Sequence, residues 1–503
     1  MSELRKDEST ESRSYASSAN DTSRRERVSE EEIAELEYGR RRNRAYHENV
    51  DQHYRVLIPA GMRVLELGCG TGRLLAGLDA ASGVGVDMDP RAVRAARQLH
   101  IDRPELTFVA GDIETMEWQR YEPFDFIILS DVTVTLRDVQ DTFAGLKAAC
   151  TPRTRLILNF HSNLWRPVFW FAEKIGRRRP QKIANWLSVQ DTLNMLVLAD
   201  FEPITVAGRI LLPLDVPVLS QLANKLLDKL PVAELVTLAW FVVARPAPAL
   251  EGRSDQPPPS VSVVVPTLNE RGNIEGAFTR TPQMGRWTEL VFIDGNSSDG
   301  TQEEIARCTE LHGHRWNRVL SLVQQGKGKG DAVRQAFDGC RGDILMILDS
   351  DLTMPPEDLT KYYAAITSRQ GEFINGCRLV YPMEDEAMRF FNILGNYFFS
   401  KVFTYLLGQP VKDTLCGTKV LWQDDYRRIA NTRKFFGGLD PFGDFDLLFG
   451  AAKLNLKIVD VPIRYQARTY GEIKISRWKH GSMLLAMSVL AFLRRMGFRE
   501  PQR

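Results

Sequence analysis

A chain of 503 residues, 44% of them hydrophobic and 26% charged, is too long for a single hydrophobic core, so we expect two folded domains. Its 65 basic and 64 acidic residues leave a formal net charge of +1, which gives no electrostatic reason to expect nucleic acid as a partner. The six cysteines are scattered, without the close pairs of zinc sites or disulfide frameworks, and this favours reduced thiols and a cytoplasmic setting.

The beginning of the chain is polar. Residues 1–28 are rich in Ser, Arg, Glu and Asp and lack the apolar stretch of a signal peptide, so we expect a disordered N-terminal segment. Long apolar runs such as Met483 to Leu493 are shorter than the roughly 20 residues that span a bilayer. The sequence therefore predicts no integral membrane segment.

Two segments each open with an apolar strand that enters a polar or Gly-rich turn, Arg63 to Leu67 and Val261 to Val265. Further strand and helix patterns follow in both halves, which favours parallel sheets flanked by helices. A Pro-rich stretch separates the halves and is typical of a linker. We therefore predict an α/β domain over 29–245, a linker over 246–260 and a second α/β domain over 261–503.

The turn after the first strand contains three alternate glycines, Gly68, Gly70 and Gly72, which let the backbone approach a ligand closely. Dinucleotide-binding turns place a third glycine three positions after the second, and Arg73 stands there. The spacing therefore disfavours NAD and favours a cofactor without a pyrophosphate.

Two acidic residues follow the glycines at the ends of the next strands. Asp87 can accept hydrogen bonds from ribose hydroxyls, and Asp112 suits an adenine amino group. Glycine turn, acid and second acid in this order resemble the class I S-adenosylmethionine-dependent methyltransferases over about residues 40 to 160. The resemblance implies a Rossmann-like fold, S-adenosylmethionine as cofactor, and these cofactor positions: Glu66, Gly68, Gly70, Gly72, Asp87, Asp112 and Ser130.

The methyl acceptor is not identified by the sequence. Ser130 and Asp131 fall on the family's strand-end segment beside the transferred methyl group. His161 could act as a general base for a hydroxyl acceptor, although a single histidine at a strand end is more often packed or hydrogen-bonded.

In the second half, polar turns again follow apolar strands. Pro266, Asn269 and Glu270 follow the strand that begins at Val261, and Asp294 ends the next one. Ligands bind at the carboxyl ends of parallel strands in open α/β sheets, so a nucleotide could lie across these turns.

The apolar strand Ile344 to Leu348 leads into Asp349 and Asp351. Carboxylates at i and i+2 after a buried strand point to one place and suit Mg²⁺ or Mn²⁺, whose charge offsets that of a leaving nucleoside diphosphate. Lys329 opens a helix after a Gly-Lys-rich loop, which favours phosphate binding, although the loop lacks the ATPase spacing and a flexible charged loop is the alternative.

From 261 to about 480 these elements resemble family 2 glycosyltransferases of the GT-A fold, in the branch of dolichyl-phosphate and polyprenyl-phosphate glycosyltransferases. The resemblance implies nucleotide-sugar positions at Pro266, Asn269, Glu270, Asp294, Lys329 and Asp349, and metal positions at Asp349 and Asp351. Two positions depart from the family: Gly295 replaces a common second Asp, and Thr353 replaces a polar side chain that can assist the metal.

Residues further along resemble the segments around the acceptor phosphate in this branch. A phosphate acceptor is already ionised at pH 7 and needs orienting cations, for which the candidates are Arg378, Arg389, Arg468 and Lys474. A hydroxyl acceptor would instead need a carboxylate base, for which the candidates are Asp413, Asp444 and Asp446. Each of these residues could equally be a salt-bridge partner.

The sequence therefore predicts a bifunctional enzyme. We expect sugar transfer from a nucleotide diphosphate sugar to a polyprenyl phosphate or related envelope acceptor, and methylation of a sugar, lipid or intermediate. The basic, apolar tail from Lys474 to Arg499 predicts peripheral contact with the inner face of the cell membrane, with packing against the domain as the alternative. The rival hypotheses are sugar transfer to hydroxyl acceptors in exopolysaccharide synthesis and a non-catalytic, cofactor-binding or partner-binding N-terminal module.

Overall fold

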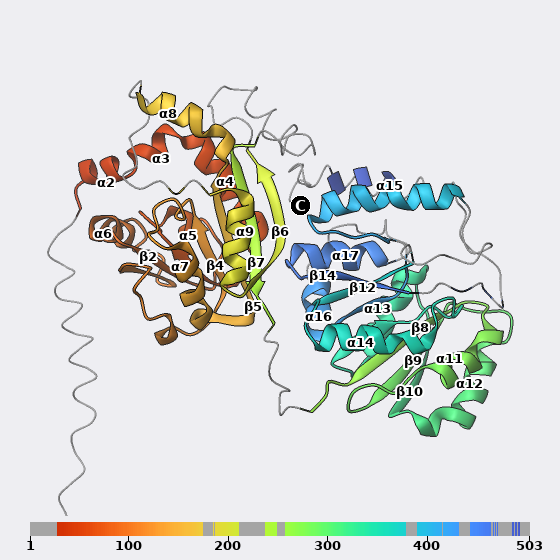
Figure 1. The fold of residues 1–503 in the computed structure, drawn as a ribbon. Coiled ribbons are helices and arrows are strands. Elements are labelled where there is room, and N and C mark those ends of the chain that lie inside the picture. The colour runs from red at the N-terminus through yellow and green to blue at the C-terminus, as the bar shows by residue number, and fades with distance from the viewer. Residues whose placement is uncertain are drawn as a thin grey trace, which may run out of the picture. The chain divides into compact units, whose positions relative to one another are not determined.

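The computed structural model describes residues 28–174, 185, 187–210, 237–248, 257–378, 390–414, 416–431, 443–463, 466, 468, 470, 485–486, 488–489 and 491–492. The chain divides into two compact units, and the main boundary falls between Pro246 and Ala247 (Figure 1). The expected disordered segment, most of the linker and most of the basic tail lie outside the described residues.

The first unit is built on a seven-stranded sheet of order β3-β2-β1-β4-β5-β7-β6. Its strands β1 to β5 pair in parallel, and β7 pairs with β5 in the antiparallel direction. The strands are β1 (Arg63–Leu67), β2 (Ser82–Asp87), β3 (Leu106–Ala110), β4 (Phe124–Ser130), β5 (Cys150–His161), β6 (Phe201–Arg209) and β7 (Ala239–Pro246).

Several helices of the first unit, α2, α6, α7 and α9, begin at short polar side chains that cap them. Asp89 accepts a hydrogen bond from the Arg91 amide at the start of α6, and Asp138 caps α7 in the same way. The α-helices are α2 (Glu30–Leu36), α3 (Tyr38–Arg42), α4 (Arg44–Leu57), α5 (Arg73–Ala76), α6 (Pro90–Leu99), α7 (Val139–Leu146), α8 (Arg166–Lys174) and α9 (Val189–Leu198).

Helix α4 has one face directed into the unit. Tyr46, Val50 and Tyr54 are buried and recur every four residues, so they lie on the same side of the helix. This spacing places the Tyr46 and Tyr54 hydroxyls near the polar ends of the central strands, where they contact the candidate site described below.

The second unit also contains a seven-stranded sheet, of order β10-β9-β8-β11-β13-β12-β14. Figure 1 shows β8, β9 and β10 side by side. The strands are β8 (Val261–Thr267), β9 (Thr288–Asp294), β10 (Arg318–Val323), β11 (Ile344–Ile347), β12 (Phe373–Cys377), β13 (Lys419–Trp422) and β14 (Ile458–Pro462).

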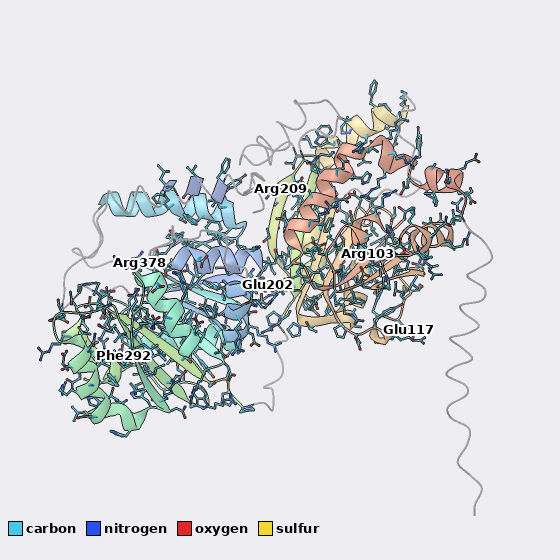
Figure 2. The ribbon with its side chains drawn as sticks, turned by 180° about the vertical axis from the view of Figure 1, so that it is seen from behind. Arg103, Glu117, Glu202, Arg209, Phe292 and Arg378 are labelled. Atoms are coloured by element: carbon cyan, nitrogen blue, oxygen red, sulfur yellow. The ribbon has the colours of Figure 1, made fainter. Side chains whose placement is uncertain are left out.

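The core of the second unit lies on both faces of this sheet. Val264 packs in one cluster with residues of α13 and α17, whereas its neighbours Val263 and Val265 pack in another with residues of α11 and α12. Phe292 of β9 belongs to the second cluster and is labelled in Figure 2. The α-helices are α11 (Ile274–Arg280), α12 (Thr301–His312), α13 (Lys329–Gly339), α14 (Leu359–Thr367), α15 (Phe390–Leu407), α16 (Gln423–Asn431) and α17 (Asp444–Lys453).

The expected α/β class is confirmed for both units, but the sheets are mixed rather than fully parallel. In the second unit β13 runs antiparallel to both β11 and β12, while β12 and β14 are parallel. Periodicity identifies a buried strand but does not give its direction, because a buried parallel strand and a buried antiparallel strand have the same apolar pattern. Among the described residues, no helix has the length and apolar character needed to cross a membrane.

Candidate functional sites

The Gly-rich turn of the first unit is hydrogen-bonded to the end of β2. The amides of Gly68 and Cys69 donate to the Val86 carbonyl, and the Gly70 amide donates to the Asp87 carboxylate at 2.7 Å. Gly68 has a φ of 72°, and a Cβ there would collide with the side chain of Val132. Glycine is therefore required at this position for both conformation and space.

The side chain of Glu66 is buried inside the first unit. The residue is only 3% exposed, and its carboxyl oxygen accepts a hydrogen bond from the Leu75 amide at 3.0 Å. Burial raises the pKa of Glu66 to about 8. In this structure Glu66 contacts α5, and its assignment to the cofactor stays a prediction.

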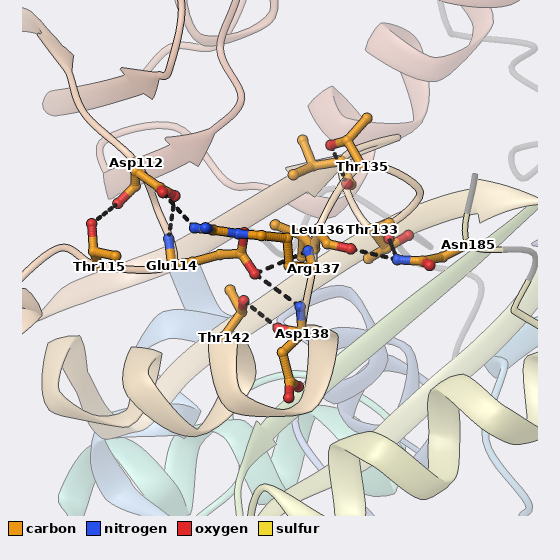
Figure 3. Close-up of polar contacts among 11 residues, drawn as sticks. Asp112, Glu114, Thr115, Thr133, Thr135, Leu136, Arg137, Asp138, Thr142 and Asn185 are labelled. Atoms are coloured by element: carbon orange, nitrogen blue, oxygen red, sulfur yellow. Dashed lines mark hydrogen bonds and ion pairs between the residues drawn. The ribbon is translucent and has the colours of Figure 1, made fainter. Parts of the chain in front are cut away.

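Asp112 lies in a polar cluster that Figure 3 shows in close-up. Its carboxylate accepts from the Glu114 amide at 3.0 Å and from the Arg137 guanidinium at 2.6 Å, and Arg137 also pairs with Glu114 at 2.9 Å. An adenine amino group that approached Asp112 would share this carboxylate with Arg137. Sequence reasoning missed Arg137, which stands 25 residues beyond Asp112.

The ends of β4 and β5 carry a second polar cluster, which we call the strand-end cluster: Tyr46, Tyr54, Asp131, Asn159 and His161. Asp131 follows Ser130, has a φ of 56°, and accepts from the Tyr46 hydroxyl at 2.9 Å and the Asn159 amide at 2.8 Å. His161 Nδ1 lies 3.5 Å from the same carboxylate, and its ring stacks on that of Tyr46. The Tyr54 hydroxyl donates to Asn159 at 2.8 Å.

In this cluster His161 is directed toward Asp131. The cluster also contains two tyrosines that the methyltransferase sequence motif did not include. Tyr46 and Tyr54 come from α4, upstream of the Gly-rich turn, and their four-residue periodicity was the only available signal. A carboxylate beside a histidine and two tyrosine hydroxyls can orient a polar acceptor and move a proton.

In the second unit, the turns after β8 and β9 are hydrogen-bonded to each other. The Asn269 amide donates to the Ser297 hydroxyl at 2.8 Å, and the Asn269 side chain accepts from the Ser298 amide at 2.8 Å. Asp294 is buried and accepts from the Ser297 amide at 2.9 Å and from Gln302 at 2.6 Å. Pro266 lies within β8 itself.

The acidic pair after β11 lies among cations. Lys329 Nζ, at the start of α13, is 2.5 Å from Asp349, and Arg468 contacts Asp351 at 2.6 Å and Glu270 at 3.2 Å. Burial alone would raise the pKa of Asp349, but Lys329 together with Lys419 and Arg378 outweighs it and holds that pKa below its ordinary value. The carboxylate of Asp349 is therefore ionised at neutral pH.

Both acidic side chains remain partly accessible, with 30% of Asp349 and 16% of Asp351 exposed. Two carboxylate ligands at i and i+2 suit a hard divalent cation, so the residues fit Mg²⁺ or Mn²⁺. Such an ion would compete with Lys329 and Arg468 for the same oxygens.

Gly417 approaches this cluster from another part of the chain. A Cβ at this position would overlap with both the Asp349 carboxylate and the Lys329 ammonium group. The absence of a side chain at 417 therefore leaves the space that the ion pair occupies, a requirement that the resemblance did not specify.

The predicted acceptor residues do not form one cluster around a phosphate: Arg468 pairs with Asp351 and Glu270, and the others that the structure describes lie elsewhere. Arg378, labelled in Figure 2, binds the Asp413 carboxylate through its backbone amide at 3.0 Å, Nε at 2.7 Å and Nη2 at 2.8 Å. Asp444, at the start of α17, lies 4.0 Å from the buried Lys419 ammonium. Asp446 lies in the same helix and is partly buried, whereas Arg389 and Lys474 are outside the described residues.

Burial would by itself raise the pKa of Asp413, but the Arg378 guanidinium outweighs that effect, so the pKa lies below its ordinary value. A fully buried carboxylate held in this way is a weak proton acceptor. Its contacts suit a positioning role better than the role of a base.

Comparison with known protein families agrees with this division of the chain. Residues 58–190 match the family described as a methyltransferase domain, and residues 262–427 match glycosyl transferase family 2.

Named relatives are glycosyltransferases. The chain is 29% identical over 215 residues to glycosyltransferase AglJ of Haloferax volcanii, covering 42% of this chain and 65% of that protein. It is 34% identical over 111 residues to dolichol-phosphate mannosyltransferase of Saccharomyces cerevisiae, covering 21% of this chain and 40% of that protein. The chain thus spans less than two thirds of the length of these relatives.

A solved S-adenosylmethionine-dependent methyltransferase from Mesorhizobium loti is 18% identical, with a TM-score of 0.30, covering 39% of this chain and 96% of that one. The two family matches fall one on each side of the boundary at Pro246. The chain therefore joins a segment that matches a methyltransferase domain to a segment that matches glycosyl transferase family 2.

Proposed function

We propose that the second unit transfers a sugar from a nucleotide diphosphate sugar to a polyprenyl phosphate or a related envelope acceptor. The observation that carries this proposal is the partly exposed carboxylate pair Asp349 and Asp351 at the end of a buried strand, with Lys329 and Arg468 beside it. A divalent ion bound there would offset the charge of the leaving diphosphate.

The chain's own residues supply the remaining parts of this mechanism. Lys329, at the amino end of α13, can pass from Asp349 to a diphosphate oxygen, because an ammonium group binds either anion. Arg468 can exchange Asp351 for a phosphate in the same way, as a guanidinium forms paired hydrogen bonds with phosphate oxygens. Asp413 holds Arg378 in place at the end of β12.

The acceptor class is part of the proposal. The name of the yeast relative contains dolichol phosphate, and an undecaprenyl-phosphate transferase of Edwardsiella ictaluri is 32% identical over 109 residues. A phosphate acceptor needs orienting cations more than a base, which agrees with the low pKa of Asp413. Transfer to a hydroxyl acceptor remains the second candidate, with Asp444 and Asp446 as carboxylates on α17.

The test of this half uses the full chain, a panel of nucleotide sugars, Mg²⁺ or Mn²⁺, and either polyprenyl phosphate or sugar acceptors, with products identified by mass. Asp349→Ala is expected to abolish sugar transfer and to leave S-adenosylmethionine binding unchanged. Asp424→Ala, on the exposed side of α16, is the matched control. Unchanged sugar transfer by Asp349→Ala would refute the assignment of Asp349 as a metal ligand. Transfer only to sugar acceptors would refute the proposal that a lipid phosphate is the acceptor.

We propose further that the first unit binds S-adenosylmethionine and methylates a sugar, lipid or intermediate of the same pathway. The Gly68 to Gly72 turn, fastened to Asp87, supports cofactor binding, and the strand-end cluster supports proton movement at the acceptor. Titration with S-adenosylmethionine, followed by methylation of cell-envelope extract, tests this half. Binding without methyl transfer would favour a regulatory module.

A further inference from the structure

A hollow of about 390 Å³ lies beside the Gly-rich turn in the first unit. Its walls come from the residue before α3, from α3 and α4, and from the first residue of α5. The lining residues are Glu37, Arg40, Arg41, Arg44, His47, Glu48, Asp51, Arg55 and Arg73. Neither the family resemblance nor the proposed function assigns a role to this hollow.

The walls carry more positive than negative charge. Five arginines face three carboxylates, which leaves two positive charges in excess. Burial lowers the pKa of His47 below its ordinary value, so the imidazole adds no charge at neutral pH.

The ion pairs within the hollow show which arginines make up the excess. Arg40 pairs with Asp51, and Arg44 pairs with Glu48 at 2.6 Å. Arg41 and Arg73 share the single carboxylate of Glu37.

Arg55 donates from Nε to the neutral Gly77 carbonyl at 2.9 Å, and it forms no ion pair with a carboxylate among the residues that the structure describes. A second acidic side chain for Arg41 is likewise absent from the lining residues. Guanidinium groups gathered in this way repel each other unless an anion enters between them.

The hollow is next to the candidate methyl-transfer site along the chain and in space. Arg73 directly follows Gly72 of the turn, and His47 directly follows Tyr46, whose hydroxyl donates to Asp131. A molecule with an anionic group in the hollow could therefore extend toward the strand-end cluster.

We propose that this hollow binds an anionic group, a phosphate or a carboxylate, of the methyl acceptor. The inference rests on the proposed methyl transfer and adds the charge class of its substrate. Guanidinium groups suit both anions because their planar donors form paired hydrogen bonds with two oxygens. None of the three turn glycines lines the hollow, so the cofactor and the anion would occupy separate places.

The test measures phosphate, acetate and S-adenosylmethionine binding by titration calorimetry on the full chain, at low salt and without divalent metal. Arg41→Gln/Arg55→Gln removes both excess charges, and the two side chains are exposed, so the fold should be retained. Arg120→Gln/Lys147→Gln removes the same charge elsewhere in this unit and is the matched control.

We expect the affinity for the preferred anion to fall at least about tenfold in the first double variant and to change less than about twofold in the control. The comparison of phosphate with acetate identifies which anion is preferred. S-adenosylmethionine affinity should stay within about twofold in both variants. Unchanged anion binding, or a tenfold loss of S-adenosylmethionine binding instead, would overturn the proposal.

Arg41→Lys/Arg55→Lys keeps both charges and separates loss of charge from loss of structure. It should retain anion affinity to within about threefold, and an equal loss in the lysine and glutamine variants would refute the charge argument. Failure of the wild-type chain to bind S-adenosylmethionine would contradict the proposed methyl transfer, whereas the anion titration would still report on the hollow.

Discussion

Replacing Asp413 with asparagine changes the negative half of a buried ion pair into a neutral amide. Asp413 is 0% exposed, and Arg378 binds it through three donors between 2.7 and 3.0 Å. Removing one partner of a buried pair costs about 3–5 kcal/mol, because the remaining charge stays desolvated. For a unit of this size, that cost lowers the melting temperature by about 6–20 °C.

Calorimetry of the full chain can measure this change, provided that the transitions of the two units are separated. We expect Asp413→Asn to lower one transition by the stated amount. Arg378→Met/Asp413→Leu, which removes both charges, should recover most of the loss. Asp424→Asn breaks the exposed pair with Arg427 and should cost less than about 1 kcal/mol.

The pH dependence gives a second check on the same pair. Because the folded pKa of Asp413 is depressed, its stabilising contribution is present above the unfolded value of about 3.9 and is lost as pH falls through the folded value. The difference in the free energy of unfolding between wild type and Asp413→Asn should therefore become smaller in acid. A change below about 1 kcal/mol at pH 7, together with complete loss of sugar transfer, would refute the positioning role and favour a catalytic base.

Three further predictions follow from the close contacts of the two sites. Gly417→Ala should lower sugar transfer at least about tenfold in the product assay, because the new methyl group displaces the Lys329–Asp349 pair, and activity equal to wild type would contradict the packing argument. As pH rises from 5 to 9, the melting temperature of Glu66→Gln should fall less than that of wild type. The pKa of Glu66 is about 8 in the folded chain and lower in the unfolded chain, so its stabilising effect is present in acid and is lost as pH rises. Parallel pH curves for the two proteins would argue that the carboxyl is already ionised. Tyr46→Phe should slow methyl transfer about tenfold with unchanged S-adenosylmethionine affinity, because Asp131 loses a hydroxyl donor, and an equal loss of cofactor binding would assign Tyr46 to the cofactor.

The local motifs could be predicted from the sequence because each combines a strand with its turn. The interpretation that a strand over Arg63 to Leu67 enters a glycine turn agrees with β1, and the strand before Asp349 agrees with β11. Apolar periodicity and glycine spacing are local properties, so one sequence suffices to identify them.

Contacts between distant segments could not be predicted in this way. Nothing in the motif around Asp351 indicates that Arg468, more than 100 residues later, would bind it, and nothing around Asp112 indicates Arg137. Such pairs depend on sheet order and loop path, which are set by the packing of the whole unit. The expectation of parallel sheets did not include the antiparallel strand β13 for the same reason.

The reversed direction of β13 determines which part of the chain meets the acidic pair. Because β13 is antiparallel to β11 and β12, its first residue lies at the edge of the sheet where those two strands end. The segment before Lys419 therefore lies beside Arg378 at the end of β12. Asp413 and Gly417 reach the site through this approach, whereas Trp422 leaves at the opposite edge. Changes in the residues just before this strand are therefore expected to alter the site more than changes at its exit near Trp422.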